Sequence, residues 1–494
     1  MSVLGVDLGT TGVRAVAFDT TGAVVAAASH AVTLVRPGPG LVEQDPGEVI
    51  SAAESVIRRA AADSVARGDR PQAMAFAVHG EAVLPLGADG APLARIPVSM
   101  DTRGEDSARA LGELVDPEWY GSTTGQPLHG MFSAFKIAAG RAGWREAAAY
   151  RCVGDFLTER WTGQAVIDST SAARVGLYDV EAQAWSEKIL SEVAGIAPWV
   201  RPEALPRAIA GGEVAGELTA DAAARLGLSA GLPVVAGAHD QAAAFLGAGG
   251  AAGGASVIGF GSSDCISVGS VVRPRSLHGT GFATYKVDSS NWVTLAGTAA
   301  GGWSLDWFAR TIGRPVEEVF DDLATVPPSL LALPYLAGLD TDPAARGLFF
   351  GLSLETSVPQ MARALVESAG FEFAKILDAL RRVGLEPGPL HVTGSGAQNS
   401  AALAVRASAA DHALTPVLKD ASARGAAILA ARGAGIHAPG LVAVPLPAGP
   451  TQRPDPLSRR WYQAQRSRYG ALYASTRKLA IPSFMNDPIQ GEEE

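Results

Sequence analysis

Gly5-Val6-Asp7-Leu8-Gly9-Thr10-Thr11-Gly12-Val13-Arg14 joins two apolar runs near the start of the chain, one over Val3 to Leu8 and one over Val13 to Phe18. Glycine and threonine between two runs rich in β-branched residues predict a β-hairpin with a tight turn. Such a turn presents backbone N–H groups and hydroxyls to one side, which makes it a suitable cradle for phosphate oxygens. The segment therefore predicts a strand–turn–strand unit that binds phosphate.

Three kinds of side chain in this hairpin carry the chemistry. Asp7 lies where the first strand ends, and a carboxylate there can hold Mg²⁺ through water. Thr10 and Thr11 offer hydroxyls, and Arg14 adds a positive charge for the same phosphates. The alternative is an ordinary hairpin whose Asp and Thr side chains satisfy turn amides. The residues alone leave both interpretations open.

Strands and helices alternate after the hairpin. Asp45 is a suitable N-cap, Pro46 occupies the first helical position and Glu48 stands at the capping-box position, so a helix is predicted from residue 46. A further strand is predicted over residues 72–78. Strands mixed with helices of this length are typical of an α/β architecture.

A second strand–turn–strand unit indicates an internal duplication. Ser256 to Gly259 and Cys265 to Val268 are predicted strands, and Gly259-Phe260-Gly261-Ser262-Ser263-Asp264 joins them. We therefore expect two related domains with a boundary near residue 245. The alternative is a chance similarity between two glycine-rich hairpins.

Composition excludes several classes of protein. The chain has 494 residues and a net charge of −10, from 40 Lys and Arg against 50 Asp and Glu, without a basic stripe that would favour nucleic acid. No apolar run approaches the roughly 20 residues of a membrane helix, and the first residues lack the basic region of a signal peptide. Two cysteines without a Cys-x-x-Cys pair fit a reducing compartment. We expect a cytoplasmic protein that binds neither nucleic acid nor membrane.

The common nucleotide-binding motifs are absent from the sequence, but a different set of motifs is present. There is no Gly-Lys pair and hence no P-loop, and no G-x-G-x-x-G that would indicate a dinucleotide oxidoreductase. The opening segment instead resembles the start of the FGGY carbohydrate kinases, a family of the actin-like ATPase superfamily. Further segments resemble the family's motifs in the family's order and extend the resemblance from residue 2 to about residue 435: Ser99 to Arg103, Leu157 to Gly163, Asp168 to Ala172, Leu232 to Gln241, Leu333 to Gly338, Arg346 to Leu352, Gly347 through Glu367, and Gly394 to Ala397. The opening hairpin alone is weakly specific, and the ordered set is strongly specific.

The resemblance implies a fold and a domain organisation. The expected fold is α/β, with two actin-like (ribonuclease H-like) domains, each a mixed central sheet flanked by helices, and a cleft between them. Residues 1–245 would form the sugar side with the first phosphate hairpin, and residues 246–455 the nucleotide side. Residues 456–494 would form a helix and a disordered acidic tail. ATP, Mg²⁺ and a small sugar or polyol are the implied ligands, and a homodimer is compatible with the resemblance.

The resemblance also gives individual residues roles. Asp7 would organise Mg²⁺. Residues of opposite domains would hold the phosphates, namely Thr10, Thr11, Arg14, Gly261 and Ser262. Small residues would line the nucleotide because they allow close approach, namely Gly302, Gly396 and Ala397.

Asp240 is the implied general base, which must come within roughly 2.6–3.2 Å of the substrate hydroxyl. The alternative is a helix N-cap in front of Gln241, the interpretation that the residues alone favour. The candidates that read the substrate hydroxyls are His79, Glu81, Asp101, Asp240 and Gln241.

Two of these candidates have a structural alternative. His79 fits a packed strand residue, and Asp101 fits the N-cap of the following helix. The pattern also departs from glycerol kinases, because Gly80 stands where they have Arg, Met131 replaces a Tyr, and Ser99 replaces a common aromatic residue. These departures argue against a plain glycerol kinase.

The predicted activity is transfer of the γ-phosphoryl group of ATP to a hydroxyl of a ketose or alditol. Two alternatives are an actin-like ATPase that remodels or activates a protein, and a sugar sensor that has lost catalysis. Asp7 and Asp240 together count against the sensor, and the C-terminal signature counts against the protein machine.

Overall fold

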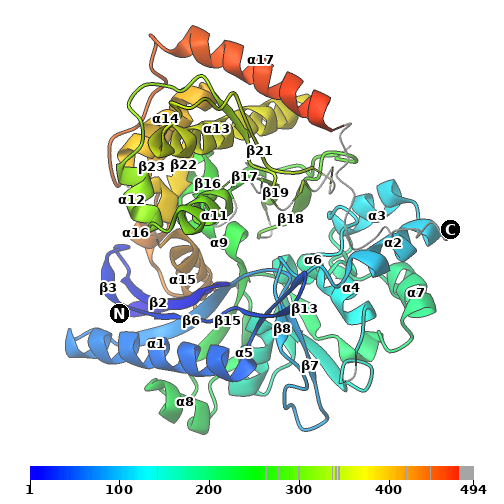
Figure 1. Cartoon of the computed structure of the whole chain (residues 1–494). Helices are drawn as coiled ribbons and strands as arrows, with labels where there is room; N and C mark the ends of the chain where they lie inside the picture. The colour runs from blue at the N-terminus through cyan, green and yellow to red at the C-terminus, as the bar shows by residue number, and fades with distance from the viewer. Residues whose placement is uncertain are drawn as a thin grey trace, which may run out of the picture.

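The computed structural model describes residues 1–477 except 142, 262–263, 276, 289, 299–300, 337, 340–341, 343–344, 418–419 and 446. The described part of the chain contains two six-stranded mixed sheets, stacked one above the other in Figure 1 with helices between and around them. This agrees with the expected α/β class.

The N-terminal sheet begins with the predicted hairpin. β1 pairs antiparallel with β2 and parallel with β6, which in turn lies parallel to β15. The strand order is β14-β15-β6-β1-β2-β3. Their bounds are β1 (Ser2–Leu8), β2 (Gly12–Asp19), β3 (Val24–Ala31), β6 (Pro71–Val78), β14 (Val214–Glu217) and β15 (Pro233–His239).

The second sheet repeats this arrangement. β16 pairs antiparallel with β17 and parallel with β22, just as β1 pairs with β2 and β6. The order is β18-β19-β17-β16-β22-β23, with bounds β16 (Ser256–Phe260), β17 (Asp264–Ser270), β18 (Ala283–Lys286), β19 (Trp292–Thr298), β22 (Leu390–Thr393) and β23 (Leu414–Pro416). The shared topology supports the internal duplication that the two hairpins indicate.

Two helices lie between the sheets. α9 (Asp240–Gly247) follows β15, and α15 (Ala421–Gly433) packs against both α9 and strands β1 and β6 (Figure 1). A helix late in the chain therefore covers one face of the N-terminal sheet. The helices α9 and α15 pack closely, because an added Cβ on Gly425 of α15 would lie 1.8 Å from the carbonyl oxygen of Ala243 on α9.

The opposite face of the N-terminal sheet is covered by α1 (Pro46–Ala66). Asp45 accepts hydrogen bonds from the backbone N–H groups of Gly47 and Glu48, as predicted. Glu48 does not close the predicted capping box, because its carboxylate accepts from the N–H and hydroxyl of Thr33 on the neighbouring segment. A tertiary contact has replaced the local one.

Smaller elements complete the fold. The N-terminal half adds β4 (Val35–Gly38), β5 (Leu41–Gln44), β7 (Val83–Leu86), β8 (Ile96–Pro97), α2 (Glu105–Leu114), α3 (Pro117–Thr124), α4 (Ser133–Ala138), β9 (Ala149–Cys152), α5 (Val153–Thr162), β10 (Val166–Asp168), α6 (Ser169–Val175), β11 (Tyr178–Asp179), β12 (Ala184–Trp185), α7 (Glu187–Ile196), β13 (Arg207–Ile209) and α8 (Ala220–Leu226). The C-terminal half adds α10 (Gly250–Gly253), α11 (Gly302–Ile312), α12 (Val316–Asp321), β20 (Leu331–Leu333), β21 (Leu348–Phe350), α13 (Val358–Arg382), α14 (Ser400–Ala410) and α16 (Pro439–Val442).

The last described helix is α17 (Arg459–Thr476), which lies along the outer side of the C-terminal half (Figure 1). Buried tyrosines fasten it there: Tyr462 bonds to Glu367, and Tyr469 bonds to Glu372, both on α13. The predicted disordered tail lies outside the described residues. Within the described part of the chain, no helix has the length and apolar character needed to cross a membrane.

Candidate active site between the two sheets

A cleft of about 2070 Å³ separates the two sheets. The N-terminal sheet contributes the strand ends, with Asp7 in the last two residues of β1, Glu81 after β6 and Asp240 after β15. Gly261 and Gly394 line it from the C-terminal half. The cleft therefore lies at the ends of neighbouring strands, where open α/β sheets place their ligands.

Asp240 is the first residue of α9 and has a quarter of its side chain exposed. Burial and the nearby charges of Asp7 and Glu81 raise the pKa of Asp240 to about 8. Burial and the charge of Asp420 raise the pKa of Asp7 to about 7, although Arg14 counteracts them. Both carboxyls thus have pKa values that allow proton transfer near neutral pH, or binding of a cation that replaces the proton.

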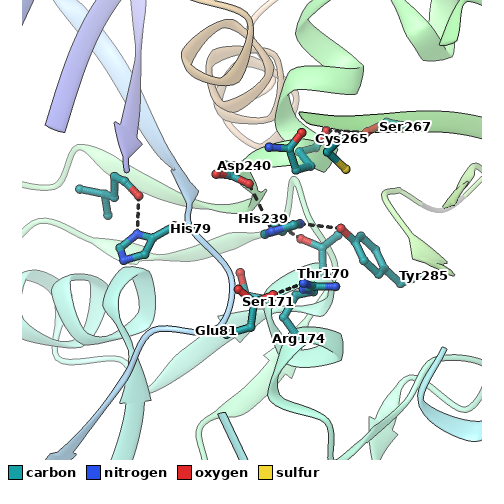
Figure 2. A network of polar contacts seen from close by, with 12 residues as sticks. His79, Glu81, Thr170, Ser171, Arg174, His239, Asp240, Cys265, Ser267 and Tyr285 are labelled. Carbon is teal, nitrogen blue, oxygen red and sulfur yellow. Dashed lines mark hydrogen bonds and ion pairs between the residues drawn. The ribbon is translucent and has the colours of Figure 1, made fainter. Parts of the chain in front are cut away.

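His239 lies between Asp240 and the C-terminal sheet (Figure 2). Its Nε2 atom is 3.2 Å from Oδ1 of Asp240, and its Nδ1 atom is 2.6 Å from the hydroxyl of Tyr285 on β18. Burial and the positive charge of Arg174 lower the pKa of His239 to about 3, so the ring is neutral at physiological pH.

Glu81 forms a buried ion pair with Arg174 of α6. Burial opposes ionisation of Glu81, but the positive charges of Arg174 and Lys136 and the hydrogen bond from Arg174 outweigh it and lower its pKa to about 2. Arg174 also donates to Gln126 at 2.9 Å. Among the described residues, its Nε–H has no acceptor. A carboxylate, a guanidinium and Asp240 therefore form one polar floor of the cleft (Figure 2).

His79 faces away from that floor in Figure 2. Its Nδ1 lies 2.6 Å from the carbonyl oxygen of Leu8, and its Nε2 lies 3.1 Å from Oε1 of Gln44. Gln44 in turn donates to the carbonyl of Thr10 at 2.7 Å. These contacts place His79 as a support of the Thr10–Thr11 turn, and its contact with substrate stays a prediction.

Asp101 is fully enclosed by donors. The backbone N–H of Val42 donates to it at 2.8 Å, and Arg103 donates from its backbone and from two side-chain nitrogens. It is not the N-cap of α2, since that position belongs to Gly104. Its contacts are those of a structural carboxylate, and its predicted contact with substrate has no support in them.

Arg14 and Asp420 connect the two halves of the chain. Nε of Arg14 lies 2.5 Å from Oδ1 of Asp420 and Nη2 lies 3.0 Å from Oδ2, a bidentate pair between β2 and the start of α15. Arg14 is therefore engaged by a carboxylate, and its contact with phosphate stays a prediction.

The predicted nucleotide residues of the C-terminal half divide into two groups. The N–H of Gly302 donates to the carbonyl of Gly261 at 3.0 Å, so these two lie together at the start of α11. Gly396 packs against Phe260, where an added Cβ would lie 3.1 Å from the Phe260 Cβ atom, and Ala397 is buried beside it. Ser262 lies outside the described residues.

The known relatives decide the family. A model of the FGGY family of carbohydrate kinases, N-terminal domain, matches residues 2–247, and the C-terminal domain model of the same family matches residues 257–434. This chain belongs to the FGGY family of carbohydrate kinases.

Individual relatives agree with that assignment. The chain is 27% identical to xylulose kinase of Klebsiella pneumoniae over 514 residues, covering 96% of this chain and 99% of that protein. It is 29% identical to glycerol kinase of Rhodospirillum rubrum over 478 residues, covering 88% and 91%. The crystal structure of xylulose kinase from Rhodospirillum rubrum superimposes with a TM-score of 0.84 at 27% identity, covering 97% of this chain and 99% of that structure. The predicted fold class is confirmed, and as an FGGY kinase the chain is a phosphotransferase of a family that uses ATP.

The family motifs did not reveal three residues of this site. Arg174 stands two residues after the matched segment Asp168 to Ala172, His239 directly precedes the motif aspartate Asp240, and Tyr285 lies in a segment without a motif. Arg174 and His239 could have been predicted from the sequence, because each stands near a matched motif residue. Tyr285 had none, since only the packing of the two sheets brings it to His239.

Gly80 stands at a closely packed point of the cleft floor of this FGGY kinase. An added Cβ on Gly80 would lie 2.9 Å from Cδ2 of His239 and 3.1 Å from Cγ of Arg174. The side chains of His239 and Arg174 occupy the space that a larger residue at position 80 needs. The positive charge at the floor of the cleft is the guanidinium of Arg174 on α6.

Proposed function

We propose that this chain transfers the γ-phosphoryl group of ATP to a hydroxyl of a small sugar, a ketose of the xylulose or ribulose type or an alditol, with Asp240 as general base. The supporting observation is the position of Asp240 at the N-terminus of α9, in the cleft that Asp7 and the Thr10–Thr11 turn also line. Xylulose kinases among the relatives favour a ketose.

In the proposed reaction, Asp240 accepts the proton of the attacking hydroxyl while the γ-phosphoryl group moves to the hydroxyl oxygen and ADP leaves. Phosphoryl transfer depends mainly on positioning and charge stabilisation, so the base assists a substrate that the cleft has already oriented. Closure of the two halves around the ligands would exclude water and limit ATP hydrolysis.

The carboxylates fit a Mg²⁺ ion that accompanies ATP. Asp7 faces the cleft with a pKa raised by burial and by Asp420, and Asp240 with a pKa raised by burial and by Asp7. A dication relieves such repulsion, and carboxylate oxygens are its preferred protein ligands. Asp7 would hold the ion through water, and the ion would neutralise charge on the phosphates.

The substrate hydroxyls are assigned to the polar floor of the cleft. Glu81 accepts hydrogen bonds, the Nε–H of Arg174 offers a donor, and Gln241 on α9 contributes an amide beside Gly259. A site built of such groups rejects analogues that leave them unpaired.

The remaining assignments are also proposals. The phosphates lie between the Thr10–Thr11 turn and the Gly261–Ser262 hairpin, with Gly302, Gly396 and Ala397 toward the nucleotide. The two domains meet near residue 245, with the C-terminal domain at 246–455 and the appended helix and tail at 456–494. A cytoplasmic homodimer is proposed for the whole protein.

The two alternative functions are not favoured. A protein-remodelling ATPase is disfavoured because both FGGY domain models match and together extend from residue 2 to residue 434. A silent sensor is disfavoured because Asp7 and Asp240 both line the cleft.

The test is Asp240→Asn in a coupled assay of ADP release over C3 to C7 ketoses and alditols. We expect a fall in kcat of about 10²- to 10⁴-fold for the preferred sugar, with ATP binding retained in calorimetry. Asp378→Asn is the matched control, since Asp378 lines the cleft on α13 and is mostly exposed. Near-normal turnover by Asp240→Asn would exclude Asp240 as the base.

A further inference from the structure

Two side chains that the phosphoryl transfer does not itself use lie in line behind Asp240, the first within 3.2 Å of its carboxylate and the second hydrogen-bonded to the first. The hydroxyl of Tyr285 lies 2.6 Å from Nδ1 of His239, and Nε2 of His239 lies 3.2 Å from Oδ1 of Asp240. Figure 2 shows the ring of His239 between the other two side chains. Tyr285 and His239 are both buried, at 1% and 5% exposure, so their mutual hydrogen bond is shielded from water.

Only one arrangement of protons satisfies both contacts when Asp240 is ionised. An ionised carboxylate accepts and does not donate, so Nε2 of His239 must carry the proton of the neutral ring. Nδ1 is then an acceptor, and the hydroxyl of Tyr285 must be the donor. Tyr285 remains able to donate, because burial raises the pKa of its hydroxyl well above the usual value. The tyrosine therefore selects the tautomer in which His239 donates to Asp240.

His239 has little freedom to adopt another position. Its backbone N–H donates to Oγ1 of Thr170 at 2.6 Å, and that hydroxyl is itself bonded to Asp168 at 2.5 Å. On the remaining side, Gly80 lies so close that an added Cβ would be 3.0 Å from Nε2. The ring is thus fixed by the backbone hydrogen bond to Thr170 and by the hydrogen bond at Nδ1, with Gly80 beside it.

Tyr285 reaches this site from the other half of the molecule. It lies on β18 of the C-terminal sheet, while His239 ends β15 of the N-terminal sheet. The neighbouring Thr284 donates its backbone N–H to the carbonyl of Gly125, the C-cap of α3, at 2.7 Å. The position of the tyrosine is therefore set by a direct backbone contact between the two halves.

We propose that His239 and Tyr285 are positioning residues for the catalytic base: Tyr285 orients the His239 ring, and His239 holds Oδ1 of Asp240 so that Oδ2 points to the substrate hydroxyl. The inference rests on the proposed role of Asp240 as the base. It makes the geometry of the base depend on a residue from each half of the chain, so that the base is oriented only when β18 is docked against the N-terminal half.

The test compares five variants in steady-state kinetics with the preferred sugar. Tyr285→Phe removes only the hydroxyl, and we expect kcat to fall about 10-fold while the KM values for sugar and ATP change less than about two-fold. His239→Leu removes the donor, with an expected loss in kcat of about 100-fold. His239→Gln retains an N–H near the position of Nε2 and should recover most of that loss.

Tyr150→Phe is the matched control, because it removes a buried tyrosine hydroxyl that bonds to the carbonyl of Trp144 outside the cleft. Its kcat should equal that of the wild type. If Asp240→Asn is inactive while Tyr285→Phe and His239→Leu keep wild-type kcat, the positioning role is wrong and the proposed base survives. If His239→Gln is no better than His239→Leu while both remain folded in thermal unfolding, donation to Asp240 is excluded. Activity in Asp240→Asn would instead reject the base itself.

Discussion

Gly80 and His239 meet at the ends of the parallel strands β6 and β15, with room for no side chain at position 80. An added Cβ would lie 2.9 Å from Cδ2 and 3.0 Å from Nε2 of His239. The glycine leaves space for the imidazole that contacts Asp240. A larger side chain at position 80 and the imidazole of His239 in its present position therefore exclude each other.

Gly80→Ala should impair catalysis by displacing His239. We expect kcat to fall at least about 10-fold and the free energy of unfolding to fall by about 1–3 kcal/mol from overpacking. ADP-release kinetics and urea unfolding measure the two effects. Gly195→Ala is the control, because among the described residues no atom outside its own helical turn lies within 4 Å of its added Cβ. Unchanged kcat in Gly80→Ala would show that the ring can move without cost.

Asp7→Asn should weaken the use of Mg²⁺. The substitution removes one charge from the carboxylates that face the cleft, and we expect the free Mg²⁺ concentration for half-maximal activity to rise about 10-fold or more. The KM for sugar should stay within about two-fold. Activity is measured against free Mg²⁺ at constant total ATP, with Asp89→Asn in an exposed turn as control. An unchanged Mg²⁺ dependence would remove Asp7 from the proposed metal site.

Glu81 should make stability depend on acidic pH. Its pKa falls from the usual 4.5 to about 2 in the folded state, because Arg174 and other positive charges outweigh burial. A depressed folded-state pKa contributes stability above pH 4.5 that is lost as pH falls toward 2. The contribution is on the order of 3 kcal/mol.

The comparison with Glu81→Gln isolates this effect. Urea unfolding of both proteins at pH 7, 5.5 and 4 should give a wild-type advantage that is constant at the two higher values and smaller at pH 4. An advantage that does not change with pH would mean that Glu81 titrates normally in the folded protein.

Gly425→Ala should destabilise the interface between the sheets. The added methyl would lie 1.8 Å from the carbonyl oxygen of Ala243, so α9 and α15 would have to separate. We expect a loss of about 3 kcal/mol in urea unfolding. Gly470→Ala on α17 meets no atom within 4 Å and should be neutral or slightly stabilising. Equal stabilities of the two variants would contradict the close packing of these helices.

Local signals predicted the elements that depend on neighbours in the sequence. The runs over Val3 to Leu8 and Val13 to Phe18 became β1 and β2, because short apolar runs joined by a Gly-Thr turn favour a hairpin wherever it lies. Asp45 caps α1 for the same local reason. The capping box failed because Thr33, brought close only by folding, offered Glu48 two donors.

The site residues also divide into those predicted from the sequence and those that only the tertiary structure brings together. Sequence alone identified Asp7 and Asp240, because family motifs mark them at strand ends. The tertiary structure alone selected Arg174 as the partner of Glu81, 93 positions away, and Tyr285 as the partner of His239, 46 positions away. Contacts between residues so far apart in the sequence are determined by the order of strands in each sheet and by the docking of one sheet on the other. Neither segment's own sequence specifies which distant residue will contact it.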